Sequence, residues 1–179
     1  MTDAPLTRLW TPEGFIEDDW THVESADALP GNGRFILPLA AFLEMTPEAR
    51  EAASGRIGVR ILPGEELSEI EPFLDSLPLI ALAFPSFSDG RSFSKAELLR
   101  NRYGFGRPVR ATGQVLVDQL PHMLRLGFTE FEISNPTLLK RLEEGVTGGI
   151  PLYYQPAISP TEGKLAQGHQ AYSWRRLKP

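Results

Sequence analysis

Residues 79–84 read LIALAF, and residues 85–92, which follow directly, read PSFSDGRS. An uninterrupted apolar run of this length is typical of a strand in a parallel sheet, because helices cover both faces of such a strand. The second stretch has the proline, serine, aspartate and glycine residues of a turn. We therefore predict that residues 79–84 are the central strand of a sheet and that a polar loop leaves its carboxyl end.

Short apolar runs alternate with segments of helical periodicity on both sides of this strand. Thr46, which precedes a proline, is a helix start signal, and Ser94 with Glu97 has the spacing of a capping box. Pro72 and Pro121 fall inside two of the expected helices, and we expect Pro121 to kink its helix. The expected strands are 34–37, 56–62, 79–84, 107–111, 128–133 and 152–157, and the expected helices are 47–54, 65–77, 94–103, 114–126 and 136–144.

The alternation of strand and helix predicts the fold class. It favours an α/β fold of repeated β-α units with a mainly parallel sheet of about six strands, either a three-layer doubly wound sheet or an incomplete β/α barrel. Residues 1–33 are polar and turn-rich, with Trp10 and Trp20 as their large apolar anchors. We expect residues 1–33 to form an N-terminal arm that packs on the domain, and residues 34–179 to form a single α/β domain.

The composition excludes several classes of protein. The chain has 179 residues, of which 41% are hydrophobic and 23% charged, the balance of a folded protein rather than a disordered one. Its net charge of -5 offers no positive field to a nucleic-acid backbone, and no apolar stretch approaches the ~18 residues of a spanning helix. The absence of cysteine excludes disulfides and thiolate chemistry. We expect a cytoplasmic protein with no nucleic-acid or membrane partner.

The carboxyl ends of the predicted strands supply the candidate site, because ligands bind there in both parallel architectures. Asp89 and Asp118 are the candidate acid/base residues, and Arg91 and Arg110 are the candidates to hold an anion with their forked donors. The other candidate ligand-binding residues are polar side chains of the same loops, namely Ser88, Gln114 and Gln119. The ligand we expect is a small anion or a nucleotide.

A purely structural role is the alternative for these residues. In that case Asp89 and Gly90 form a turn, and Arg91 pairs with Asp118 to tie two loops together.

No motif in the chain indicates a cofactor or a metal. Both Gly-x-Gly sequences precede strands, whereas a dinucleotide site needs one that follows a strand and opens a helix. His22, His122 and His169 are far apart and lack metal-ligand spacing. We therefore expect neither a cofactor nor a metal, and we expect each histidine to be an ordinary surface or core residue.

Several stretches of the sequence resemble a bacterial family of unknown function. They are FPSFSDGRSFS at 84–94, LLR at 98–100, VRATG at 109–113 and VLVDQ at 115–119, within a match over about residues 34–157. Genes of that family are commonly found beside those of assimilatory sulfite reduction, and its members are often labelled probable oxidoreductases of that pathway. The resemblance implies a part in sulfate or sulfite assimilation, with enzymes of that pathway as partners.

Two classes of function fit these observations. The leading hypothesis is an accessory factor of sulfate or sulfite reduction that binds a partner enzyme or an anionic ligand through Asp89, Arg91, Arg110 and Asp118. The alternative is an enzyme in which Asp89 or Asp118 performs acid/base chemistry on an anionic substrate, or an oxidoreductase with a borrowed cofactor. Assembly into a homo-oligomer is left open.

Overall fold

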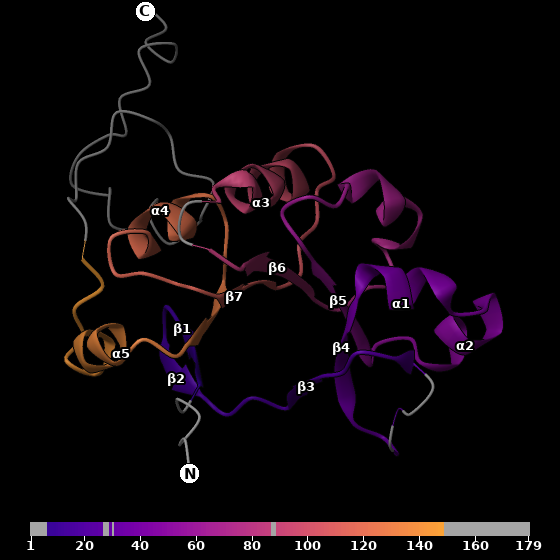
Figure 1. Cartoon of the computed structure of the whole chain (residues 1–179), viewed down its shortest axis with the longest axis horizontal. Helices are drawn as coiled ribbons and strands as arrows, with labels where there is room; N and C mark the ends of the chain where they lie inside the picture. The colour runs from indigo at the N-terminus through magenta and orange to yellow at the C-terminus, as the bar shows by residue number, and fades with distance from the viewer. Residues whose placement is uncertain (1–6, 27–28, 30, 87–88, 149–179) are drawn as a thin grey trace, which may run out of the picture.

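The computed structural model describes residues 7–26, 29, 31–86 and 89–148, and its strands form a single sheet (Figure 1). Within the described residues the sheet has eight strands in the order β2-β1-β8-β7-β6-β5-β4-β3. Neighbouring strands from β3 to β8 are parallel, whereas β1 is antiparallel to both β8 and β2. The strands are β1 (Arg8–Thr11), β2 (Gly14–Ile16), β3 (Trp20–His22), β4 (Arg34–Pro38), β5 (Ile57–Ile61), β6 (Ile80–Phe84), β7 (Val109–Gly113) and β8 (Glu130–Ile133).

The helices cover one face of the sheet, which we call the outer face (Figure 1). Ile80, Leu82 and Phe84 point outward from β6, because every second side chain of a strand lies on the same face. They share one apolar core with the buried apolar residues of α1, α3, α4 and α5. The helices are α1 (Leu39–Glu44), α2 (Pro47–Ala52), α3 (Arg91–Asn101), α4 (Leu120–Arg125) and α5 (Pro136–Glu143), with the 3-10 turns η2 (Leu67–Glu69) and η3 (Glu71–Phe73).

The sheet is curled, so that its two edges approach each other. Trp20, the first residue of β3, follows Ile16, the last residue of β2, by only four positions. That length of chain reaches at most about 14 Å, whereas eight strands laid flat would separate β2 from β3 by about 34 Å. Residues 17–19, which we call the strap, therefore bridge the open side of an incomplete β/α barrel, away from α1, α3 and α4 (Figure 1).

The inner face of the barrel is apolar beside β4 and the start of β6. Ile36, Leu79 and Ala81 form a small second core there, and Trp20 packs against it. Gly58 makes room for the indole, since a Cβ at this position would lie 2.9 Å from Leu79 Cδ2 and 3.3 Å from Trp20 Cζ3. The inner face at β7 and β8 bears polar side chains instead.

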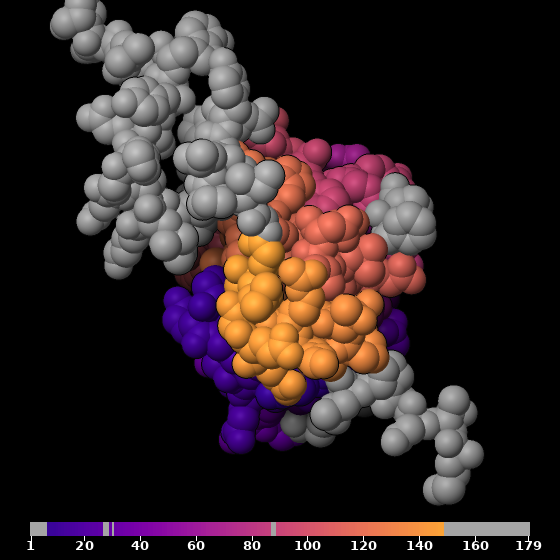
Figure 2. All heavy atoms as spheres, turned by 90° about the vertical axis from the view of Figure 1, so that its left-hand side faces the viewer, coloured from indigo at the N-terminus to yellow at the C-terminus, as the bar shows by residue number. Residues whose placement is uncertain are grey.

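Helix α5 and the hairpin of β1 and β2 lie side by side (Figure 2). Arg8 of β1 donates to the carboxylate of Glu143 at the end of α5. The Arg8 guanidinium also lies 3.9 Å from the centre of the Phe15 ring on β2, within cation–π range. The last described helix is thus fastened to the first two strands.

The sheet confirms the mixed α/β class and corrects the expected arrangement. It has eight strands rather than about six, because residues 8–22 of the expected arm supply β1, β2 and β3. A doubly wound sheet reverses its strand order at a switch point, whereas β3 to β8 follow one another in sequence order. The three-layer alternative is therefore wrong, and the incomplete barrel is the better description. The strand expected at 152–157 lies outside the described residues.

Two expected helices are much shorter than predicted, each because of a proline. The segment 65–77 contains only the turns η2 and η3, and Pro72 lies in the first turn of η3. Within 114–126 the helix begins only at α4, with Pro121 in its first turn. A proline there removes no helical hydrogen bond, so the kink predicted at Pro121 is wrong.

Two other helices begin at capping residues that the sequence shows. Thr46 caps α2 by accepting a hydrogen bond from Ala49 N, and Asn135 caps α5 by accepting one from Leu138 N. The predicted start at Ser94 is wrong, because α3 begins three residues earlier after Gly90. Helix α1 was not predicted.

Candidate functional site

A cluster of polar side chains lines the inner face of the barrel at β7 and β8. Its members come from strands in which inward polar residues alternate with apolar residues that point to the helices. The cluster, which we call the Arg110 network, consists of Arg110 and Thr112 from β7, Glu130 and Glu132 from β8, Asp18 from the strap and His22 from β3.

Arg110 is the centre of this network, and its side chain is only 1% exposed. Nε donates to Glu130 Oε2 at 2.8 Å, and Nη2 lies 2.8 Å from the same oxygen. Nη1 donates to both oxygens of Asp18 at 3.1 and 2.9 Å, and to Glu132 Oε1 at 3.2 Å. Burial lowers the pKa of Arg110, but the charges of Glu130, Asp18 and Glu132 outweigh burial and raise it. The guanidinium is charged, and three carboxylates occupy its donors.

Glu132 connects Arg110 to two further polar groups. Its Oε1 lies 2.8 Å from His22 Nε2, and its Oε2 accepts a hydrogen bond from the Thr112 hydroxyl at 2.5 Å. Burial raises the pKa of Glu132, but His22, Thr112 and Arg110 together lower it below its ordinary value. Glu132 is therefore an ionised carboxylate that can only accept, so the Nε2 atom of His22 is the one that carries a proton.

The strap makes Asp18 the link between the network and solvent. The Asp18 side chain is 30% exposed, and its Oδ1 also accepts a hydrogen bond from Trp20 N at 3.1 Å. A hollow of about 360 Å³ lies beside the strap, lined by Thr7, Arg8, Leu9, Phe15, Ile16, Glu17 and Asp18. A molecule in this hollow would reach the network through Asp18.

A second inward arginine lies on β5. Arg60 Nη2 donates to Glu24 Oε1 and Oε2 at 3.1 and 3.3 Å. The Arg60 side chain is 24% exposed and that of Glu24 is 77% exposed. This pair is open to solvent, unlike the pairs of Arg110.

Asp89 and Arg91, the candidates from the sequence, pair with each other at the start of α3. Nε and Nη2 of Arg91 donate to the two carboxylate oxygens of Asp89 at 2.9 and 2.7 Å. The Arg91 side chain is 64% exposed. Its hydrogen bond lowers the pKa of Asp89 to about 2, although desolvation opposes this effect. The pair is local and needs only the turn that contains it.

The structure does not bring the predicted site residues together. Within the described ranges, no hydrogen bond or ion pair joins the Asp89–Arg91 turn to the Arg110 network or to Asp118. Gln114 and Asp118 are exposed in the loop between β7 and α4, and Gln119 is half-buried at the start of α4. Ser88 lies outside the described residues.

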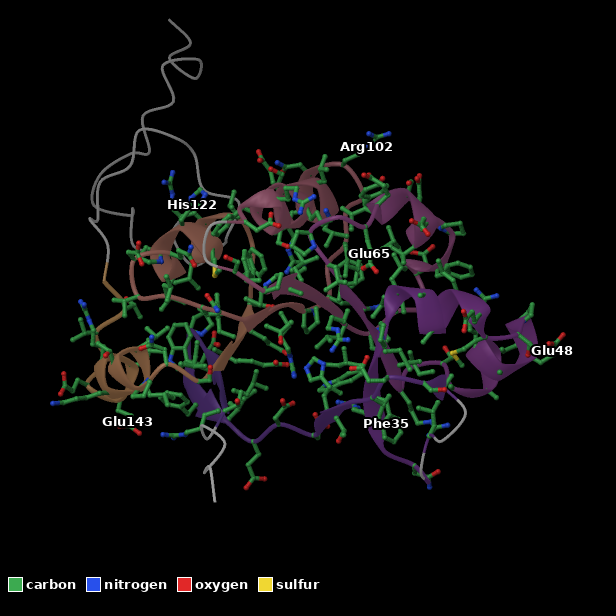
Figure 3. The ribbon with its side chains drawn as sticks, viewed as in Figure 1. Phe35, Glu48, Glu65, Arg102, His122 and Glu143 are labelled. Carbon is green, nitrogen blue, oxygen red and sulfur yellow. The ribbon has the colours of Figure 1, made fainter. Side chains whose placement is uncertain are left out.

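Of the network, only Arg110 is among the site residues that the sequence predicts. Nothing in the sequence singles out His22, because its partner Glu132 is 110 residues away in the chain. His122, by contrast, is an exposed residue of α4 on the helical side (Figure 3). Partial desolvation and the charge of Arg125 lower the pKa of His122, against an opposing effect of Glu97.

The described part of the chain contains no group of three or more histidine, cysteine, aspartate or glutamate side chains that could hold a metal ion. In the same residues, none of the helices has both the length and the apolar content that crossing a bilayer requires.

Comparison with known proteins gives a family for the chain. No curated protein matches it. Residues 58–163 match the model of a family described as "Bacterial protein of unknown function (DUF934)". The match begins in β5 and includes Arg110, Thr112, Glu130 and Glu132, whereas Asp18 and His22 precede it. Because this match covers more than half of the 179 residues, the chain belongs to this bacterial family of unknown function.

Proposed function

We propose that this protein is an enzyme that transfers a proton at the carboxyl end of its incomplete barrel. His22 is the acid/base residue, and Glu132 is the carboxylate that orients it. The observation that carries the proposal is the 2.8 Å contact between His22 Nε2 and Glu132 Oε1. This replaces Asp89 and Asp118 as the groups to which we assign acid/base chemistry.

The geometry supports this role for His22 in three respects. A buried carboxylate that holds one imidazole nitrogen fixes the tautomer and the ring orientation. The neutral ring then presents Nδ1 as a proton acceptor. The His22 side chain is 31% exposed, so a substrate can reach it. Its place at the last position of β3 is where parallel barrels hold their catalytic residues.

Arg110 and Thr112 are positioning residues in this proposal. Arg110 donates to Oε1 of Glu132, the oxygen that His22 also contacts, and Thr112 donates to Oε2. Together they keep the carboxylate ionised and fixed in place. Arg110 does not hold the substrate, because three carboxylates already occupy its donors.

Nitrogen NMR and genetic rescue test the proposal together. In wild type we expect the neutral His22 ring to be protonated on Nε2, and in Glu132→Gln we expect this preference to weaken. His22→Gln should fold normally and fail to rescue a strain that lacks the gene. His122→Gln is the matched control and should rescue fully. Full rescue by His22→Gln, or an Nδ1-protonated ring in wild type, would contradict the assignment.

The biological setting we propose is assimilatory sulfate or sulfite reduction. The support is the resemblance of the 84–119 region to a family whose genes commonly lie beside those of that pathway. A deletion strain should grow poorly with sulfate or sulfite as its sulfur source and normally with a reduced sulfur source. Equal growth on all three would remove this part of the proposal and leave the proton-transfer site to be tested separately.

An accessory role is the second candidate, and the exposure of Arg91 favours it. An arginine that is 64% exposed, and held in one orientation by Asp89, can receive an acidic group of a partner protein. Affinity capture under sulfate-limited growth should recover an enzyme of sulfite assimilation with wild type but not with Arg91→Glu. Equal recovery by both proteins excludes this turn as the docking point.

A further inference from the structure

Arg60 lies on the inner face of β5, one position before the end of the strand. Its Cα partner on β6 is Ala81, and the Cα partner of Ala81 on β7 is Arg110. Two arginines therefore face the inside of the barrel from strands that flank β6. Their surroundings differ, because Arg110 is 1% exposed whereas Arg60 is 24% exposed.

The partner of Arg60 is easily displaced. Among the described residues its side-chain hydrogen bonds go to Glu24 alone, and the Glu24 side chain is 77% exposed. Exposed ion pairs contribute little, since water solvates both ions nearly as well. An incoming anion can take the place of Glu24 without leaving a buried carboxylate unpaired.

The wall between Arg60 and the Arg110 network bears very short side chains. Ala81 and Ala83 are the inward residues of β6, and they lie beside Arg60 on one strand and Thr112 on the other. Leu82 and Phe84 of the same strand point outward into the core under the helices. Neighbouring side chains pack over this wall, since Ala81 is fully buried in the small core with Ile36 and Leu79, and Ala83 is 7% exposed.

We propose that Arg60 anchors an oxyanion group of the substrate, a phosphate, a sulfate or a carboxylate, in place of Glu24. The guanidinium fork suits the paired oxygens of these groups. That the anion belongs to a substrate rests on the proton-transfer function proposed for His22. In this arrangement Arg60 binds the charged end of the molecule, and His22 acts on a group beyond it.

Anion titration by NMR tests the proposal on the intact chain. The Nε–Hε signal of Arg60 is followed during addition of phosphate, sulfate or acetate, with chloride used to hold ionic strength constant. We expect a saturable shift in wild type and its loss in Arg60→Gln. Glu24→Gln should bind up to about fivefold more tightly, because it lacks the competing carboxylate of one exposed pair. The three anions distinguish a tetrahedral dianion from a carboxylate.

Two variants serve as controls. Arg91→Gln removes an arginine outside the barrel that is more exposed than Arg60, and it should leave the titration unchanged. His22→Gln should also bind the anion, so this experiment tests the role of Arg60 separately from the role proposed for His22. An unmoved Arg60 signal, saturable binding that survives Arg60→Gln, or loss of binding in Arg91→Gln overturns the proposal. If Arg60→Gln does not fold, absence of tighter binding in Glu24→Gln overturns it instead.

Discussion

Arg110 and Arg91 are both arginines that bind carboxylates, yet one is buried and the other is exposed to solvent. Arg110 is 1% exposed and binds three carboxylates that come from the strap and from β8. Arg91 is 64% exposed and binds a carboxylate two residues before it. The first arrangement exists only in the folded barrel, whereas the second can form in any chain that makes the turn.

An arginine that stabilises the fold through buried ion pairs is therefore a different residue from one that can bind a ligand. Desolvating a guanidinium and three carboxylates is costly, and the network persists because the guanidinium binds each of the carboxylates. The same mutual satisfaction leaves Arg110 unable to receive a ligand. Arg91 and Arg60 are available for the opposite reason, because water solvates much of each pair.

The largest expected effect comes from Arg110→Met, which removes the buried ion pairs of the Arg110 network. It leaves Asp18, Glu130 and Glu132 together without a cation, and removal of one partner from a buried pair costs roughly 3–5 kcal/mol. Urea denaturation should show this loss or a protein that no longer folds. Arg110→Lys should be only a partial remedy, because an ammonium cannot reproduce the fork. A variant Arg110→Met as stable as wild type would falsify a central role for the network.

Glu132→Gln should cost about 1–3 kcal/mol at neutral pH, because it weakens charge-assisted hydrogen bonds to Arg110, Thr112 and His22. The pKa of Glu132 is lowered in the folded state, so its stabilisation is complete above the ordinary value of 4.5. That stabilisation disappears as pH falls through the lower folded pKa. Urea midpoints measured from pH 7 downward should therefore converge for wild type and variant below about pH 4.5. A difference that stays constant down to acid pH contradicts this assignment.

Asp18→Asn should have a smaller effect, about 1 kcal/mol, because Asp18 is partly exposed and Arg110 keeps two other carboxylates. The asparagine can still accept from the guanidinium but carries no charge. Hydrogen exchange should speed up in β3, which the strap connects to β2. Unchanged exchange there means that the strap does not depend on this ion pair.

The smallest effect is expected for Arg91→Gln, the exposed half of the comparison. The urea midpoint should not shift measurably, because the pair ties no distant segments together. The pKa of Asp89, lowered to about 2 by Arg91, should rise toward its ordinary value of 3.8, as carbon NMR can follow. A clear loss of stability would show that the turn supports more of the fold than its contacts indicate.

Local features were the part of the fold that the sequence could predict. The strand at 79–84, the cap at Thr46 and the start of α5 after Asn135 depend on neighbouring residues, and the structure places them close to where they were expected. The segment 65–77 has the apolar spacing of a helix, but it also contains Pro72. In the structure the proline limits that segment to short turns.

The candidate site was less accessible to sequence reasoning. Arg110 was proposed, but with Asp89, Arg91 and Asp118 as companions. One signal could have corrected this. Polar residues alternate with apolar ones both in 109–112 and in 130–133, which indicates strands with a polar inner face rather than strands apolar on both faces.

The sequence by itself determined the succession of β-α units, the apolar residues that meet the helices and the turn that contains Asp89 and Gly90. Each of these follows from periodicity or from neighbours in the chain. Only the tertiary structure decided that the sheet curls, that the strap closes its open side and that His22 meets Glu132. Those contacts join residues about a hundred positions apart, and they form only because the edges of the sheet approach each other.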